Sequence, residues 1–168
     1  MKNLFVIIGG DAAGMSAASK ARRENPELEI IVFERGSWAS YGACGLPYYI
    51  KGDIKNIKDL IGIPPEIFIE KRNIDLRLNH EVIKIIPEEK KLIVRNRDGN
   101  IKQGYDKLLI STGARTVKPN IKGIESGGVF ALRDMDSGKN IKNFLHEKLP
   151  ESVLIVGGGY IGMEMAEA

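Results

Sequence analysis

A lone cysteine stands in the segment of the chain whose residues most suggest chemistry. Cys44 lies in the stretch SYGACGLPYY over residues 40–49, between Gly42 and Gly45 and before a short helix expected around 45–50. A buried, inert thiol is the common state of a free cysteine, whereas this irregular setting favours the reactive thiolate. The sequence has no second cysteine, so a reactive Cys44 must cycle through a mixed disulfide with a small thiol or through a sulfenic acid.

A glycine-rich loop follows the first apolar run of the chain, Leu4–Ile8. It consists of Gly9, Gly10, Asp11, Ala12, Ala13 and Gly14. Between a strand and a helix, such a loop can seat a dinucleotide pyrophosphate on free backbone amides and on the positive end of the helix dipole. Asp11 occupies the middle glycine position of GxGxxG, and a tight strand-to-helix turn is the alternative interpretation. Glu34, at the end of the next apolar run, is the carboxylate expected to bind ribose hydroxyls.

A second loop near the end of the chain matches GxGxxG in full. It consists of Gly157, Gly158, Gly159, Tyr160, Ile161 and Gly162, and it follows the apolar run Val153–Val156. Two such loops imply two nucleotides in two related domains, whereas an ordinary dehydrogenase needs only one. A flavin together with a nicotinamide explains both loops, because hydride can pass between them.

Three polar residues share one face of the helix expected over 12–24. Ser16, Lys20 and Arg23 are spaced at i, i+4 and i+7. A solvated helix face is one interpretation of this stripe, and a surface that binds the phosphates of an anionic substrate is the other. His80 and His146 are expected to be surface residues, and Trp38 is expected to be a packing residue.

The elements that position these residues follow from apolar periodicity. Buried parallel strands are expected at 4–8, 29–33, 74–78 and 107–110, with a short helix over 65–71. Alternating segments at 81–86, 91–95 and 101–104, with Asp98-Gly99 as a hairpin turn, predict an antiparallel meander. A linker over 115–128 precedes a helix capped by Asp136 or Ser137, a strand at 153–156 and a helix from Tyr160. A strand and a partial helix do not make a domain, so we expect the front part, or a natural truncation, of a longer protein.

Composition narrows the class of protein. The chain has 168 residues, a formal net charge of +3 and 43% hydrophobic residues, which excludes disordered and fibrous classes. The weak, interleaved charge does not indicate nucleic-acid binding, and no apolar run approaches the roughly 18 residues of a membrane span. One cysteine and two histidines argue against a metal site. A free thiol is typical of a reducing compartment, so we expect a cytoplasmic protein without nucleic-acid or membrane partners.

Together these residues resemble the pyridine nucleotide-disulfide oxidoreductases with a single redox cysteine, a group that includes coenzyme A disulfide reductases, NADH oxidases and NADH peroxidases. The segment Ser40–Tyr49 is similar to the S-F-x-x-C-G-x-P-Y signature, with Tyr41 in place of Phe. Further matches lie at Gly9–Arg23, Glu34-Arg35, Tyr105–Leu108, Ser111–Ala114, Leu132-Arg133 and Val156–Glu164. The likeness covers essentially the whole chain, which corresponds to the front portion of much longer enzymes.

The resemblance implies an α/β fold. We expect a Rossmann-like FAD-binding domain with a three-layer ββα-type architecture and a β-meander insertion, followed by the truncated start of a second Rossmann-like, NAD(P)-binding domain. The expected boundaries are 1–115 for the first segment of the FAD-binding domain, 116–150 for a linker and connecting helix, and 151–168 for the start of the NAD(P)-binding domain.

The resemblance also implies a role for each matching residue. Cys44 would be the redox nucleophile over the flavin. The positions that would hold FAD are Gly9, Gly10, Asp11, Ala12, Ala13, Gly14, Glu34, Arg35, the backbone of Val82 at the adenine, Ser111, Thr112, Gly113, Ala114 and Arg133. NAD(P)H would bind at Gly157, Gly159, Tyr160, Ile161 and Gly162, with Tyr160 shielding the flavin until the nicotinamide arrives. The positions that contact coenzyme A in its disulfide reductases match Ser16, Lys20, Arg23, Ser40, Ala43 and Arg72.

The implied function is an FAD-dependent NAD(P)H oxidoreductase that reduces coenzyme A disulfide, or a related persulfide or polysulfide, through Cys44. The full-length form is expected to be a homodimer. Two alternatives stay open: an NADH oxidase or peroxidase that reduces O₂ or peroxide through a sulfenic acid, and a non-catalytic nucleotide-binding fragment. Ala43 stands where many members have Asn, which removes a side-chain hydrogen bond near the thiol.

Overall fold

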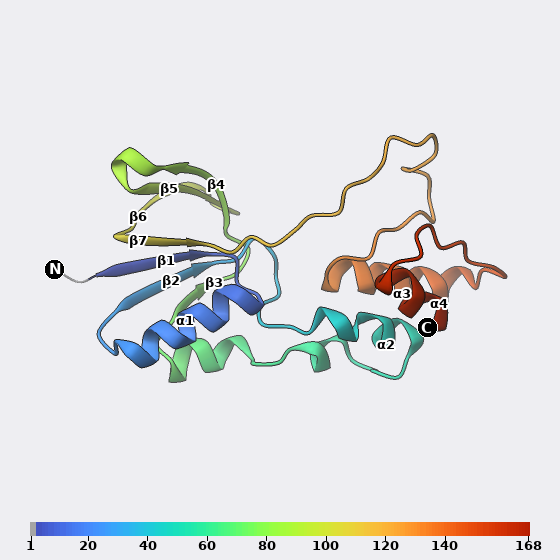
Figure 1. Ribbon diagram of the computed structural model, residues 1–168, viewed down its shortest axis with the longest axis horizontal. Helices are drawn as coiled ribbons and strands as arrows, with labels where there is room; N and C mark the ends of the chain where they lie inside the picture. The colour runs from blue at the N-terminus through green and yellow to red at the C-terminus, as the bar shows by residue number, and fades with distance from the viewer. Residues whose placement is uncertain (1–2) are drawn as a thin grey trace. The chain divides into compact units, whose positions relative to one another are not determined.

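The computed structural model describes residues 3–168 and divides into two compact units. The first unit contains the chain up to Tyr41 together with Ile61–Gly113, and the second contains Gly42–Leu60 together with Ala114–Ala168. Figure 1 labels their helices and strands. Each unit is described by itself.

The first unit is built on a parallel sheet. Its strands lie in the order β3 (Asp75–Arg77), β2 (Glu29–Phe33), β1 (Leu4–Ile8) and β7 (Lys107–Ile110). All three pairings are parallel, and α1 (Ala12–Glu24) connects β1 to β2. The four predicted parallel strands are therefore confirmed. Their continuous apolar runs suit strands that are covered on both faces.

A three-stranded antiparallel sheet completes the first unit. It consists of β4 (Glu81–Ile86), β5 (Lys91–Asn96) and β6 (Gly99–Gly104), in that order. Gly99 adopts a φ of +125° at the turn between β5 and β6, a conformation that glycine adopts without steric cost. The predicted β-meander is therefore confirmed. Its turn consists of Arg97 and Asp98, one residue earlier than predicted, and Gly99 is the first residue of β6, paired with Asn96.

Two apolar cores form within this unit. Ile7 of β1 is fully buried in a cluster with Met15 of α1, whereas its neighbour Val6 is fully buried in a cluster with Leu92 of β5. Successive side chains of a strand point to opposite faces, so α1 covers one face of the parallel sheet and the antiparallel sheet covers the other (Figure 1). This is the expected three-layer architecture. The short helix predicted at 65–71 forms as a π-helical turn over Ile67–Lys71, with Phe68 buried in the first cluster.

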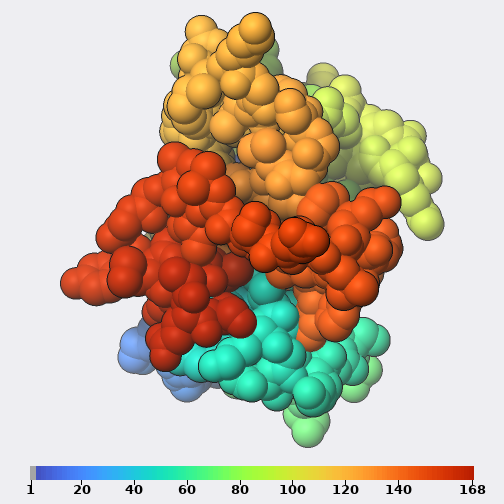
Figure 2. All heavy atoms as spheres, turned by 90° about the vertical axis from the view of Figure 1, so that its right-hand side faces the viewer, coloured from blue at the N-terminus to red at the C-terminus, as the bar shows by residue number. Residues whose placement is uncertain are grey.

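The second unit contains the cysteine segment and three helices. A 3₁₀ turn at Ala43–Gly45 leads into α2 (Leu46–Lys51), and another 3₁₀ turn spans Ile57–Leu60. α3 (Met135–Lys148) packs on α2, and α4 (Tyr160–Glu167) lies near the end of the chain. Figure 2 shows the teal 42–60 region and the orange α3 region on one face. A Cβ at Gly138 would lie 2.7 Å from Leu46 Cδ2, so a larger residue there would have to displace the Leu46 side chain.

α3 begins earlier than the sequence predicted. Asp134 is its N-cap, because the Asp134 carboxylate accepts from Ser137 N at 2.9 Å and Ser137 Oγ accepts from Asp134 N at 2.8 Å. This reciprocal capping box uses Ser137 at the third helical position. The predicted caps, Asp136 and Ser137, both lie inside the helix, so that prediction was wrong by two or three residues.

The strand predicted at 153–156 is not formed. Leu154 is 88% and Val156 is 86% exposed, and none of the strands in residues 3–168 pairs with this run. A strand needs a neighbour to satisfy its backbone groups, and an apolar pattern alone does not supply one. The helix predicted from Tyr160 is confirmed as α4. Within residues 3–168, no helix combines the length and apolar character needed to cross a membrane.

Candidate functional site

The first glycine loop is closed so tightly that two of its positions admit no side chain. Gly9 has a φ of +104°, and a Cβ there would lie 2.2 Å from the carbonyl oxygen of Ser111. A Cβ on Gly14 would lie 1.8 Å from the carbonyl oxygen of Gly9. The glycines therefore allow the start of α1 to approach the ends of β1 and β7 closely, as a dinucleotide-binding turn requires.

Asp11 is the N-cap residue of α1, yet within the described residues it makes no side-chain cap hydrogen bond. Its carboxylate instead accepts from the backbone N–H of Tyr41 at 3.1 Å. Gly10 O accepts from Ser40 N, also at 3.1 Å, and Ser40 itself has a left-handed φ of 52°. Asp11, the residue that departs from GxGxxG, therefore holds the backbone of Tyr41. The first backbone amides of α1 have no side-chain cap and are available to an anion.

Glu34 lies beside this loop at the end of β2, as predicted. Its carboxylate accepts from Gly10 N at 2.7 Å and from Gly36 N at 2.8 Å. A Cβ on Gly10 would lie 2.9 Å from Glu34 Cβ, so the two segments are in close contact. An acid held at this place is available to ribose hydroxyls next to the loop.

Ser111 lies at the end of β7, where its Oγ donates to Ile8 O at 2.9 Å. The structure therefore brings together the loop, Glu34 and Ser111 at the carboxyl ends of β1, β2 and β7. Thr112 and Gly113 follow Ser111 and are exposed. Arg35 is also exposed, and Val82 lies on β4 opposite Val94 of β5.

This arrangement fits the diphosphate and adenosine parts of a dinucleotide. The glycine cradle leaves no room for a Cβ, the helix start lacks a side-chain cap in the described chain, and a carboxylate stands beside it. The remaining two FAD candidates belong to the second unit, where Arg133 Nε donates to Ala114 O at 3.1 Å.

Cys44 is an exposed free thiol in the 3₁₀ turn that precedes α2. The turn is held by Gly45 N donating to Gly42 O at 3.0 Å and by Gly42 N donating to Leu60 O at 2.8 Å. A Cβ on Gly45 would lie 2.3 Å from Leu60 Cδ2. Gly45 is tightly packed, but the neighbouring Cys44 is exposed, which does not agree with its interpretation as a buried hydrophobic residue. The exposed thiol is accessible to a disulfide.

Lys142 of α3 holds the far end of the cysteine segment. Its Nζ donates to Tyr49 O at 2.5 Å and lies 4.0 Å from the centroid of the Tyr49 ring. Burial lowers the pKa of Lys142 below its ordinary 10.5, and nearby Lys55 lowers it further. No local pattern predicts this contact, because it joins residues that are 93 positions apart in the chain.

The basic stripe of α1 is exposed at Ser16, Lys20 and Arg23. Lys20 forms an ion pair with Glu24 one turn along, as on an ordinary solvated face. Arg72 nevertheless reaches the same helix, where its Nη1 donates to Ser19 Oγ at 2.7 Å. Sequence reasoning missed Ser19, which is buried.

The second glycine loop repeats the closure of the first. Gly157 has a φ of +117°, and a Cβ on Gly162 would lie 2.2 Å from Gly157 O. Gly159 is the N-cap of α4, Tyr160 is 93% exposed, and α4 has no side-chain cap within residues 3–168. No group of three or more His, Cys, Asp or Glu side chains in this described range is placed to hold a metal ion.

Known proteins resemble this chain along its whole length. Residues 4–168 match the family described as pyridine nucleotide-disulphide oxidoreductase. The chain is 44% identical over 168 residues to the NAD(P)H sulfur oxidoreductase (CoA-dependent) of Pyrococcus abyssi, covering 100% of this chain and 37% of that protein. It is 37% identical over 162 residues to the NADH oxidase of Methanocaldococcus jannaschii, covering 96% of this chain and 36% of that protein.

A solved structure shows the same fold. The reduced CoADR-RHD protein of Bacillus anthracis superposes with a TM-score of 0.95 at 39% identity, covering 99% of this chain and 30% of that one. The chain thus spans little more than a third of the length of the curated relatives described above.

Proposed function

Because the chain belongs to the pyridine nucleotide-disulphide oxidoreductase family, we propose that it forms part of an FAD-dependent NAD(P)H oxidoreductase that reduces coenzyme A disulfide. A related persulfide or polysulfide is the other substrate of this class. The observation that carries the proposal is the exposed thiol of Cys44, held in a tight turn of a chain that also has two dinucleotide-type glycine loops.

The first loop and the strand ends beside it would hold FAD. The uncapped start of α1 would bind the diphosphate, Glu34 would bind ribose, and Arg35, the Val82 backbone and Ser111–Ala114, with Arg133, would complete the site. FAD, when bound, supplies two-electron transfer from NAD(P)H to sulfur. The second loop, Gly157–Gly162, would bind NAD(P)H, with Tyr160 shielding the flavin until the nicotinamide arrives.

The sulfur chemistry is assigned to Cys44. Its thiolate forms a bond to one sulfur of coenzyme A disulfide, the substrate S–S bond breaks, and one coenzyme A thiolate leaves. Two electrons from NAD(P)H and a proton then reduce the mixed disulfide, which releases the second coenzyme A and restores Cys44. The sum is one NAD(P)H and one proton consumed for two coenzyme A thiols.

Positively charged residues of the first unit would recognise the phosphates of coenzyme A. Lys20 and Arg23 are exposed cations on α1, and Arg72 is oriented by Ser19 and by Phe68, whose ring centroid lies 5.0 Å from the Arg72 guanidinium carbon. Guanidinium groups bind phosphate well through paired N–H donors. Ser16, Ser40 and Ala43 would complete the contact.

The division of the chain into a first FAD-binding segment (1–115), a linker and helix (116–150) and the start of an NAD(P)-binding domain (151–168) is part of this proposal. So are a homodimeric full-length form and a cytoplasmic location, which a free thiol favours.

The second candidate is an NADH oxidase or peroxidase, favoured by the similarity to the Methanocaldococcus jannaschii protein. In that case peroxide would oxidise the Cys44 thiolate to a sulfenic acid and release water or hydroxide. The same exposed thiol would serve both reactions.

Mass spectrometry of the purified chain distinguishes the two candidates. The reduced chain is mixed without oxygen with coenzyme A disulfide or with hydrogen peroxide, and Cys44→Ser is the control. The proposal predicts a coenzyme A adduct on Cys44, one released coenzyme A per chain and no adduct on the variant. A stable sulfenic acid with peroxide, and no adduct with coenzyme A disulfide, would select the oxidase instead.

A further inference from the structure

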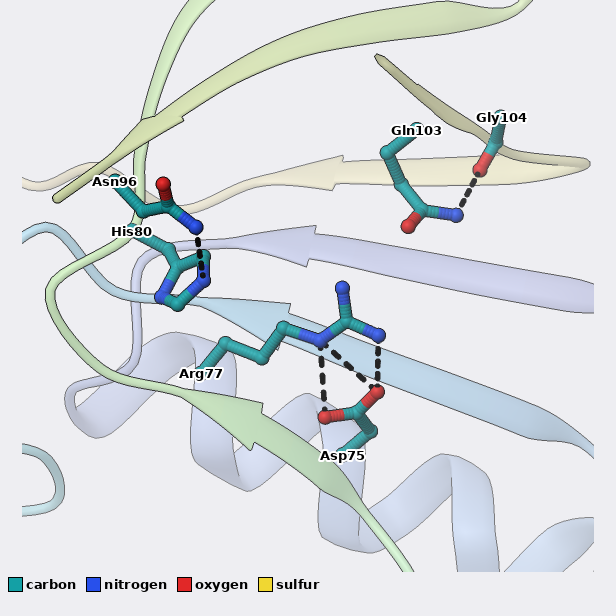
Figure 3. Close-up of polar contacts among 6 residues, drawn as sticks. All are labelled: Asp75, Arg77, His80, Asn96, Gln103 and Gly104. Carbon is teal, nitrogen blue, oxygen red and sulfur yellow. Dashed lines mark hydrogen bonds and ion pairs between the residues drawn. The ribbon is translucent and has the colours of Figure 1, made fainter. Parts of the chain in front are cut away.

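His80 joins the antiparallel sheet to the end of β2 where Glu34 lies. Its backbone N–H donates to Glu34 O at 2.9 Å, and its ring Nδ1 lies 2.7 Å from Leu78 O. Its Nε2 lies 3.3 Å from Nδ2 of Asn96, the last residue of β5 (Figure 3). The ring is half-buried 6.2 Å from the ring of Phe33, so the prediction of a plain surface residue was wrong.

The neighbours of the His80 ring fix its hydrogen-bonding roles. Leu78 O only accepts, so Nδ1 carries the proton. Asn96 Oδ1 accepts from the backbone N–H of Asp98 at 2.9 Å, which orients the amide with its Nδ2 toward the ring. Nε2 therefore accepts from Asn96, and only the neutral ring can do so.

The turn that carries His80 supports the backbone around Glu34. Glu34 N donates to Arg77 O at 2.9 Å, and Asn79 N donates to Gly36 O at 2.9 Å. Asn79 adopts a left-handed φ of 57°, and the contact from the ring to Leu78 O closes this turn from inside. A continuous series of contacts thus runs from Asn96 through His80 to Glu34, whose carboxylate holds the Gly10 amide.

We propose that His80 is a positioning residue for the Glu34 carboxylate, with the Asn96 amide as the partner that orients its ring. The inference rests on the proposed function, because it assigns Glu34 to the ribose of a bound dinucleotide. Protonation of Nε2 would place its N–H opposite the N–H donors of Asn96 Nδ2, so the hydrogen bond between His80 and Asn96 would be lost. If the Asn96 amide rotated by 180°, its Nδ2 would instead face the backbone N–H of Asp98, again a donor opposite a donor. The protonated ring therefore loosens Glu34 and weakens the hold on the dinucleotide.

Several charged side chains on the neighbouring strands and turns have partners of their own. Glu34 accepts from two backbone amides. The ion pairs around the ring are Arg77–Asp75 on β3, Glu81–Arg95 between β4 and β5, and Arg97–Asp98 at the turn after β5 (the first is drawn in Figure 3). The ring of His80 is the titratable group in direct contact with the Asn96 amide.

The test uses two readouts on the full 168-residue chain. The first is the exchange protection of the Gly10 amide in the ligand-free chain, measured by NMR as the His80 ring is titrated in the same spectra. The second is the Kd for FAD from flavin fluorescence. In the wild type, both Gly10 protection and FAD affinity should fall about fivefold as the His80 ring becomes protonated.

Variants decide whether the ring acts through Asn96. Asn96→Asp supplies an acceptor for protonated Nε2. In this variant, Gly10 amide protection and FAD affinity should therefore rise on acidification, the opposite of the wild type. His80→Phe keeps a ring against Phe33 but should lose about tenfold in both readouts at every pH, and His80→Gln should recover part of the loss. Gln103→Ala on β6, whose side chain donates only to Gly104 O (Figure 3), is the matched control and should behave as wild type.

An Asn96→Asp pH profile that matches the wild type would overturn the positioning role. So would wild-type protection of Gly10 in a folded His80→Phe chain. Failure of the proposed function looks different: the Gly10 readout would follow these expectations while the wild type bound no FAD at any pH.

Discussion

The carboxylate of Asp11 accepts a hydrogen bond from the backbone amide of Tyr41 at 3.1 Å. Asp11 stands where the dinucleotide fingerprint has its middle glycine, and a carboxylate directed at a phosphate would repel it. The contact with Tyr41 gives this carboxylate a partner at the segment that leads to the cysteine turn. Asp11, which replaces the middle glycine, therefore anchors the backbone of Tyr41.

Replacement of Asp11 should separate its two properties, the acceptor oxygen and the charge. Asp11→Asn keeps an acceptor for Tyr41 N–H and should change the free energy of unfolding little, whereas Asp11→Ala should lower it by about 1 kcal/mol. Urea unfolding of both variants measures this. Equal losses in the two variants would show that the hydrogen bond to Tyr41 does not stabilise the fold.

Gly14→Ala tests the closure of the first loop. The added Cβ would lie 1.8 Å from Gly9 O, a backbone atom that cannot move without displacing the loop, so we expect a loss of about 3 kcal/mol or more in unfolding free energy. Gly127→Ala is the matched control, because a Cβ there meets nothing within 4 Å, and its effect should stay within about 0.5 kcal/mol. Similar stabilities of the two variants would refute the tight closure.

Lys142 makes a prediction about alkaline pH. Burial, with a contribution from Lys55, lowers its pKa in the folded state below the ordinary 10.5, so between the two values the unfolded chain binds more protons. Stability therefore gains from this group as pH rises through that window. The stability advantage of wild type over Lys142→Met, measured by urea unfolding at several pH values up to 10.5, should grow with pH. A constant or shrinking advantage would contradict the lowered pKa.

The 168-residue chain alone should not oxidise NADH with coenzyme A disulfide. It spans 37% of the length of the Pyrococcus abyssi relative, and the run at 153–156 after the linker has no paired strand within the described residues. Absorbance of NADH, followed with added FAD and coenzyme A disulfide, is the measurement, and the chain without FAD is its blank. Steady turnover that depends on Cys44 would show that the chain is active by itself.

Local pattern predicted most of the first unit. The solid apolar runs at β1, β2 and β7 identified parallel strands because such strands are covered on both faces, and Asp98-Gly99 identified the β5–β6 turn through its backbone conformation. The glycine loop and Glu34 were found together because their spacing along the chain reflects one strand–helix–strand unit.

What the pattern missed depends on partners distant in sequence. The apolar run at 153–156 looks like β1, but a strand exists only where another strand pairs with it. The cap of α3 is a local exception, because Asp134 and Ser137 form a reciprocal capping box only three residues apart. The contacts of His80 with Asn96 and of Lys142 with Tyr49 span 16 and 93 positions, and no periodicity encodes them.

Cys44 is an exposed thiol, and we propose that the chain around it recognises coenzyme A disulfide. The most direct measurement is the rate of thiol loss against disulfide concentration, with coenzyme A disulfide compared with the uncharged 2-hydroxyethyl disulfide. We expect a rate that saturates for coenzyme A disulfide, stays linear for the uncharged disulfide, and loses saturation in Arg72→Gln. Linear dependence on both disulfides with equal rate constants, or a thiol that reacts only after unfolding, would contradict it.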